Sequence, residues 1–351
     1  MAVRFSNASM MGRWKTFDLY ALIRYLDMVE AETYRKAKAL FEKVMENMRR
    51  RIIGQDEVIE QMIVAIITGN HALLEGYPGL GKTMMIRALA ETMDLKFSRV
   101  QCTPDLMPSD ITGTYVIEEE PNTGKKSFQF QEGPVFSNVV LADEINRTTP
   151  KTQSALLEAM QEKQVTVGNK TFPLEPPFFV LATQNPIEME GTYPLPEAQL
   201  DRFLLKLMVE YPSFEDENKV VDLYTGEKIP QIQTLLNKDI ILDLGKLVRM
   251  MPISNDMREY VMRIVVATRP SEENKTASQY LDYGASSRAG IGIVLASKAR
   301  ALLHGNNFVS KADIEAMALP VLRHRLILNF ESEREGVTTD DVTKMIVDEV
   351  G

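Results

Sequence analysis

The sequence predicts an α/β fold in which a central parallel sheet is followed by an all-helical domain. After Gly54, short apolar runs bounded by glycine, proline and polar residues alternate with helical patterns, as is typical of parallel strands covered by helices on both faces. Beyond Tyr211 the apolar runs stop and only helical patterns follow. We therefore predict a helical N-terminal extension over residues 1–50, an α/β core over 51–211 and a helical C-terminal domain over 212–351.

Composition limits the classes of protein to consider. The chain has 351 residues, of which 44% are hydrophobic, and a net charge of −9, which fits a soluble globular protein of two or three domains. Its single cysteine, Cys102, cannot form an internal disulfide, which favours a reducing, cytoplasmic location. The apolar stretches fall far short of the roughly 20 residues that a membrane helix needs. The acidic balance argues against a dedicated duplex-DNA binder.

The first predicted element is a long amphipathic helix. Residues 16–51 are dense in helix formers, and Ala37, Phe41, Val44 and Met48 recur on one helical face, so this face should pack on the core. Within the core we expect buried strands at residues 73–74, 139–142 and 178–182, and helices at residues 83–93 and 151–163.

Two segments interrupt the alternation of strands and helices. Residues 112–130 and 164–172 alternate apolar and polar residues around turn signals at Pro121–Gly124 and Gly168–Asn169, so each should form a β-hairpin. The C-terminal domain should consist of helices over residues 215–224, 242–251, 256–268, 288–303, 311–328 and 339–349.

A phosphate-binding loop is the strongest motif in the chain. The run from Gly76 to Thr83 fits G-x-x-x-x-G-K-[ST], follows an apolar strand and precedes a helix. Glycines let the backbone N–H groups turn inward, and the next helix directs its positive end at the same anion. Lys82 then meets the β- and γ-phosphates, and the Thr83 hydroxyl is a ligand for Mg²⁺. The predicted nucleotide contacts here are Gly76, Pro78, Gly79, Leu80, Gly81, Lys82, Thr83 and Met84.

Acidic and amide side chains follow two further strands. The apolar run of residues 139–142 ends in Asp143 and Glu144, which predicts Asp143 beside the metal and Glu144 where it orients or deprotonates a water. Asn185 follows the third strand and could bind the γ-phosphate or the attacking water. Alternatively, Asn185 caps the turn before Pro186. Gln101, which ends the strand after Lys96, is a candidate for coupling partner binding to Glu144.

The order of these parts resembles that of the AAA+ ATPases: a phosphate loop, an Asp-Glu strand, an Asn-tipped strand and a helical region with a late arginine. Within them, five longer motifs resemble the MoxR family. These are Leu141–Arg147, Lys151–Glu162, Ala182–Pro186, Pro196–Phe203 and Gly284–Ala289. The resemblance runs from about Arg51 to the C-terminus.

The resemblance implies further site residues. Residues 76–83 match Walker A, Asp143 and Glu144 match Walker B, Asn185 matches sensor 1, and Ile53, Gly54 and Gln55 match the segment along adenine. Arg202 matches the arginine finger that reaches a neighbouring subunit's γ-phosphate, and Arg288 matches sensor 2 on a lid over the nucleotide. Guanidinium groups suit both roles because they stay charged and bind oxyanions in a fork. Two roles remain for Arg147: a contact between subunits or an internal ion pair.

The implied function is an ATPase that binds ATP and Mg²⁺, assembles into a ring, expected to be a hexamer, and remodels a partner protein. The resemblance implies a partner with a von Willebrand factor A domain and the maturation of that partner's client complex, with both hairpins facing the ring pore. A nucleic-acid motor of the helicase type is the alternative. The first hairpin mixes Lys125 and Lys126 with residues Glu118–Glu120, which is more typical of a solvated face than of backbone tracking. Glu144, Asn185 and Arg202 together speak against a nucleotide switch without turnover.

Overall fold

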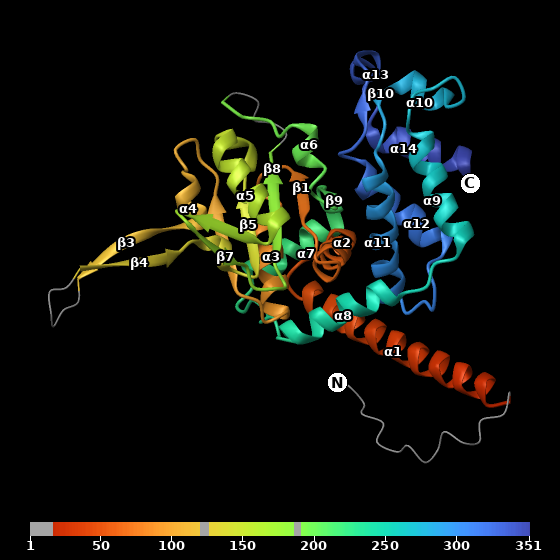
Figure 1. The fold of residues 1–351 in the computed structure, drawn as a ribbon, viewed down its shortest axis with the longest axis horizontal. Helices are drawn as coiled ribbons and strands as arrows, with labels where there is room; N and C mark the ends of the chain where they lie inside the picture. Colours follow the sequence, from red (N-terminus) through yellow and green to blue (C-terminus); the bar gives the residue numbers. More distant parts are fainter. Residues whose placement is uncertain (1–16, 120–125, 186–190) are drawn as a thin grey trace.

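The computed structural model describes residues 17–119, 126–185 and 191–351 (Figure 1). The first 16 residues, the predicted turn at Pro121–Gly124 and Pro186 lie outside this part of the chain. Within the described residues, no helix is both long and apolar enough to cross a membrane.

The core is built on a parallel sheet of five strands in the order β2-β5-β8-β1-β9. The strands are β1 (Ala72–Gly76), β2 (Phe97–Gln101), β5 (Val139–Asp143), β8 (Phe179–Gln184) and β9 (Leu205–Val209). The predicted strands at residues 73–74, 139–142 and 178–182 are confirmed. Strand β9 was missed because, at the sheet edge, buried Leu205, Leu207 and Val209 alternate with partly exposed residues, so no continuous apolar run marks it.

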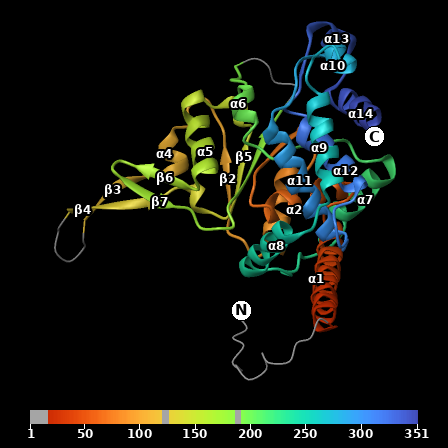
Figure 2. The ribbon, with the colours of Figure 1, turned by 45° about the vertical axis from the view of Figure 1, so that its right-hand side comes forward.

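Helices pack on both faces of this sheet. The core helices are α2 (Asp56–Ile67), α3 (Lys82–Thr92), α4 (Pro108–Thr112), α5 (Pro150–Glu162) and α6 (Glu197–Leu200), with 3₁₀ turns at Pro134–Phe136 and Ile145–Arg147. Helix α1 (Phe17–Arg49) buries Val44 and Met48 against the core, which confirms the predicted amphipathic helix. Its N-terminal half extends away from the other helices in both ribbon views (Figures 1 and 2).

Both predicted hairpins are confirmed as antiparallel pairs. Strand β3 (Gly113–Glu119) pairs with β4 (Lys126–Glu132), and β6 (Gln164–Val167) pairs with β7 (Lys170–Pro173). The first hairpin projects far from the sheet (Figure 1, left). At its base, a Cβ atom on Gly113 would lie 2.3 Å from the Gln131 carbonyl oxygen, so only glycine permits this close approach of the two strands.

Beyond Tyr211 the chain is mainly helical. This part contains α7 (Phe214–Thr225), α8 (Lys238–Met250), α9 (Asn255–Ala267), α10 (Lys275–Tyr280), α11 (Ser287–Leu303), α12 (Lys311–Leu322), α13 (Phe330–Glu335) and α14 (Thr339–Val350). Two expectations need correction. This part is not all-helical, because β10 (Leu281–Tyr283) pairs with β11 (Ile327–Leu328). The helix expected to run to Leu328 ends at Leu322. Ile327 and Leu328 instead form β11 and pair with β10.

Candidate nucleotide and catalytic site

The phosphate loop joins the end of β1 to the start of α3. Gly79 and Gly81 have φ angles of +86° and +73°, a region that L side chains rarely adopt. A Cβ atom on Gly76 would lie 2.8 Å from the Val209 carbonyl oxygen, so this glycine lets β1 approach β9. The glycines of the motif therefore serve both the turn of the loop and its packing on the sheet.

Lys82 lies at the first position of α3, close to the acidic residues of the site. Its ammonium group donates to the Gly76 carbonyl oxygen. Burial lowers the pKa of Lys82, and the charges of Asp143, Glu144 and Glu75 act in the opposite direction. The lysine therefore shares one electrostatic environment with both Walker B acids, as the motif predicts. Thr83 is the next residue of the same helix.

Asp143 and Glu144 are oriented by a side chain on the neighbouring strand. The Thr183 hydroxyl on β8 donates to Asp143 Oδ1 over 2.7 Å and accepts from the Glu144 backbone N–H over 2.8 Å. Glu144 has a φ of +59°, which turns its side chain out of the strand direction. One hydroxyl thus sets the backbone and side-chain geometry of both acids. Thr183 was not among the predicted site residues, although it lies on the strand that ends before Asn185.

Arginine side chains neutralise both acids in this structure. Arg99 on β2 donates to Asp143 Oδ2 over 2.6 Å, and Arg147 donates to Glu144 Oε2 over 2.9 Å. Gln101 links the two pairs, because it accepts from Arg99 over 2.6 Å and donates to Glu144 over 3.1 Å. Arg147 therefore makes the internal ion pair, one of its two predicted fates. Arg99 was missed; its only signal was its place two residues before Gln101 on the same strand face.

The strand order decides where Asn185 lies. Strand β8 lies between β5 and β1, and the carboxyl ends of parallel strands share one edge of the sheet. Asn185, one residue beyond β8 and buried, therefore lies between the Walker B acids and the phosphate loop. This is the place expected for a sensor of the γ-phosphate.

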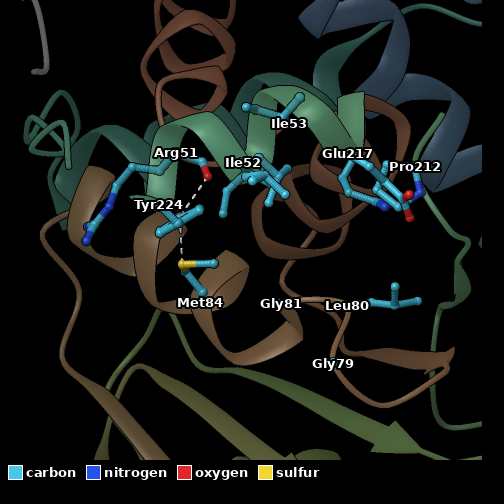
Figure 3. Close-up of a pocket in the computed structure, with 13 residues that line it drawn as sticks. Arg51, Ile52, Ile53, Gly79, Leu80, Gly81, Met84, Pro212, Glu217 and Tyr224 are labelled. Atoms are coloured by element: carbon cyan, nitrogen blue, oxygen red, sulfur yellow. Dashed lines mark hydrogen bonds between the residues drawn. The ribbon is translucent and has the colours of Figure 1, made fainter. Parts of the chain in front are cut away.

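A mainly apolar cavity of about 360 Å³ opens beside the phosphate loop (Figure 3). We call it the phosphate-loop cavity. It is lined by Arg51, Ile52, Ile53, Gln55, Gly79, Leu80, Gly81, Met84, Pro212, Glu217, Val220, Val221 and Tyr224. Ile53 and Gln55 thus line it as the resemblance implies. The predicted contacts that do not line it are Gly54, Gly76, Pro78, Lys82, Thr83 and Asp143. Gln55 is held by a 3.0 Å bond to the Glu210 carbonyl oxygen.

Helix α7 supplies the wall of this cavity that the sequence analysis did not foresee. The Tyr224 hydroxyl donates to the Arg51 carbonyl oxygen over 3.0 Å and contacts Met84 Sδ (Figure 3). The side of the cavity that Ile53 and Gln55 line therefore joins the segment before α2 to a helix on the far side of Tyr211. The boundary predicted near Tyr211 passes through this cavity.

Arg202 and Arg288 lie together, away from the phosphate-loop cavity. Both line a second cavity of about 440 Å³ between the core and the lid domain, which we call the arginine cavity. Arg202 donates to the Leu157 carbonyl oxygen over 2.9 Å, and Arg288 pairs with Asp201 over 3.0 Å. The expected position of Arg288 over the chain's own nucleotide is therefore not the one it occupies, because the Asp201 carboxylate holds it at the arginine cavity.

The candidate Mg²⁺ ligands are Thr83 and Asp143. A hydroxyl and a carboxylate are the hard oxygen donors that Mg²⁺ prefers, and Mg²⁺ usually completes its shell with substrate phosphates and water. Where the structure describes the chain, no three His, Cys, Asp or Glu side chains are grouped closely enough to hold a metal by themselves. The Arg99 guanidinium already marks Asp143 Oδ2 as a cation-binding atom. These donors fit a metal that arrives with a nucleotide.

Family models match both parts of the chain. Residues 71–205 match the ATPase family associated with various cellular activities (AAA), and residues 273–346 match the AAA lid domain. The fold and the site therefore define an AAA-type ATPase core with its lid.

Similar proteins narrow the assignment. Chaperone MoxR1 of Mycobacterium tuberculosis is 40% identical over 91% of this chain and 83% of its own length, and Protein MoxR of Methylorubrum extorquens is 29% identical over 88% and 93%. The crystal structure of a candidate ATPase from Cytophaga hutchinsonii is 42% identical, with a TM-score of 0.84 over 91% of this chain and 97% of that one. The chain belongs to the MoxR family of AAA+ ATPases.

Proposed function

We propose that this protein hydrolyses Mg²⁺-bound ATP to ADP and phosphate. One observation carries the proposal: the phosphate loop, the acids Asp143 and Glu144, and Asn185 meet at the carboxyl ends of three adjacent strands. This arrangement suits phosphoryl transfer, in which catalysis consists mainly of positioning and charge stabilisation.

Each residue then has a defined task. Lys82 and the loop N–H groups bind the phosphates, and Thr83 and Asp143 hold Mg²⁺, which would neutralise developing charge on the phosphate oxygens. Glu144 orients and deprotonates the attacking water, and Asn185 contacts the γ-phosphate or that water. Arg99 and Arg147 must release the two carboxylates before these roles begin.

We also propose that the chain works as a ring, with the hexamer as the expected form. Arg202 and Arg288 line a cavity that shares no residue with the phosphate-loop cavity. Since both are suited to binding phosphate oxygens, a nucleotide on a neighbouring copy is their natural target. Hydrolysis would then depend on assembly.

The work performed by the ring is the coarsest part of the proposal. A relative 40% identical to this chain is named a chaperone, and we propose remodelling of a partner protein in the cytoplasm. By family resemblance this partner carries a von Willebrand factor A domain. The helicase alternative gains no support, because the described part of the projecting hairpin exposes Ile117 and Phe128 beside Glu119 and Lys126 rather than a basic face.

The variant Glu144→Gln tests the catalytic assignment. It should bind ATP with wild-type affinity in calorimetry and release no phosphate, because an amide cannot accept the proton of the water. Glu46→Gln, an exposed change on α1, is the matched control and should behave as wild type. Wild-type phosphate release from the Glu144 variant would contradict the assignment. Held with ATP, the same variant should retain the partner protein in a pull-down.

A further inference from the structure

The arginine cavity carries an unusual charge for this acidic protein. Its described lining includes the cations Lys163, Arg202, Arg249, Arg288 and Arg325. Among the same lining residues Asp201 is the one acid. Like charges gathered on one wall repel each other, so the arrangement needs an anion that arrives from outside or a resident carboxylate that orders it.

Asp201 meets two arginines through different oxygen atoms. Its Oδ1 accepts from Arg325 Nε over 2.7 Å, and its Oδ2 accepts from Arg288 Nη1 over 3.0 Å. Asp201 directly precedes Arg202. One carboxylate therefore determines how the guanidinium of Arg288 lies relative to the arginine-finger segment.

The two partners of Asp201 differ in exposure. The Arg325 side chain is 5% exposed and also donates to the carbonyl oxygens of Phe203 and Leu204 over 2.7 and 3.1 Å. Desolvation lowers the pKa of Arg325, and the Asp201 charge opposes this shift. The Arg288 side chain is 63% exposed, and exposed ion pairs are weak. Asp201 thus has a permanent buried partner and an exchangeable one.

The helix that carries Arg288 is seated firmly on the core. One turn further along α11, a Cβ atom on Gly292 would lie 3.2 Å from Val321 and 3.3 Å from Leu204, so α11 packs closely against α12 and the segment after Arg202. Backbone position alone brings Arg288 near Arg202. Its long side chain still needs a partner to select one rotamer.

We propose that Asp201 is a positioning residue that holds Arg288 beside Arg202, so that both guanidinium groups meet the same polyphosphate of a neighbouring subunit. This inference rests on the proposed ATPase function and names a further residue for it. On arrival of the nucleotide, Arg288 exchanges the carboxylate oxygen for a phosphate oxygen, while Arg325 keeps Asp201 in place.

The test is the steady-state ATPase kinetics of the full-length variant Asp201→Asn, which keeps an oxygen for Arg325 and removes the charge that orders Arg288. We expect kcat to fall at least about tenfold, with KM for ATP within about threefold of wild type, because the nucleotide's own cavity is unchanged. Adding Arg288→Ala to this variant should cause little further loss, since residues that act as a unit are not additive. Losses that multiply would overturn the proposal, and so would an unchanged or raised kcat.

Asp340→Asn controls for a merely structural effect. Asp340 pairs with Arg323, two residues from Arg325, in the same contact between lid and core, but it does not touch Arg288. It should keep wild-type kcat, and a loss equal to that of Asp201→Asn would overturn the proposal. If the Asn variant does not fold, Asp201→Glu provides a second test. It keeps the charge for Arg325 but moves the carboxylate oxygens, so kcat should still fall. An unchanged kcat in this variant would contradict the positioning role of Asp201. A wild-type protein without ATPase activity would instead refute the proposed function itself.

Discussion

The phosphate-loop cavity and the arginine cavity are built in opposite ways. The phosphate side of the first depends on one contiguous motif, since residues 79–84 supply its loop and the start of α3, and the glycines there are set by local backbone angles. The second gathers residues that are far apart in the chain, such as Lys163, Asp201, Arg288 and Arg325. The difference teaches that a short motif can build one side of a cavity by itself, whereas a cluster of charges needs elements that are distant in the chain.

The two cavities also differ in charge. At the catalytic edge beside the first, the acids Asp143 and Glu144 take arginine partners. In the second, the described lining holds five cations and one acid, Asp201, which pairs with Arg288 and Arg325. Our proposal that the first binds the nucleotide of its own chain, and that the second acts on the nucleotide of another, accounts for this difference.

The largest expected effect comes from removing Arg202, the predicted arginine finger. Arg202→Ala should lower kcat by about a thousandfold, the loss typical of a missing arginine finger, while ATP affinity measured by calorimetry stays near wild type. Arg334→Ala, an exposed change on α13, is the control. Mixing Arg202→Ala with Glu144→Gln should restore part of the activity, because one variant supplies the acid and the other the arginine. Absence of restored activity would break the comparison.

The arginine cavity also contains a histidine, His71, in its wall. We therefore expect the packing around it to lose stability at acidic pH. His71 accepts from the Val180 N–H and bonds the Met160 carbonyl oxygen, and burial lowers its pKa to about 4. Between pH 6.5 and pH 4, His71 is therefore protonated in the unfolded state but neutral in the folded state. The His71 contribution to stability is full above pH 6.5 and falls by about 3 kcal/mol as pH drops to 4.

Urea unfolding between pH 7 and pH 4 measures this effect. His71→Gln should be less stable at pH 7 but should lose less stability on acidification than wild type, because glutamine has no proton to gain in this range. Burial and the nearby Arg325 also lower the pKa of His324, so the contact between lid and core should weaken in the same direction. An identical pH slope in wild type and variant would contradict the role of His71.

The smallest predicted effect concerns the phosphate-loop cavity. Tyr224→Phe removes the hydroxyl that donates to the Arg51 carbonyl oxygen and contacts Met84 Sδ but keeps the aromatic ring in the cavity wall. One lost hydrogen bond costs about 1 kcal/mol, so ATP should bind roughly fivefold more weakly while kcat remains near wild type. Tyr283→Phe, an exposed change on β10, should alter neither. A fall in kcat would show that α7 also takes part in catalysis.

Local motifs account for the parts of the site that could be predicted. The phosphate loop, the acids after β5 and the two hairpins were readable because glycine turns, apolar runs and alternating residues act over a few positions. Arg99 and Thr183 were missed because each is an ordinary strand residue until β2, β5 and β8 lie side by side. The β10-β11 ribbon was missed because two or three residues give too short a pattern to recognise.

The sequence by itself determined the fold class, the phosphate-loop motif and the family, since these rest on short-range backbone geometry and on residue types at fixed spacing. Only the tertiary structure decided that Tyr224 lines the phosphate-loop cavity and that Arg288 pairs with Asp201 beside Arg202. The physical reason is the distance along the chain between the residues that interact. Ion pairs and cavity walls join residues tens to hundreds of positions apart, and their partners are chosen by how the elements pack.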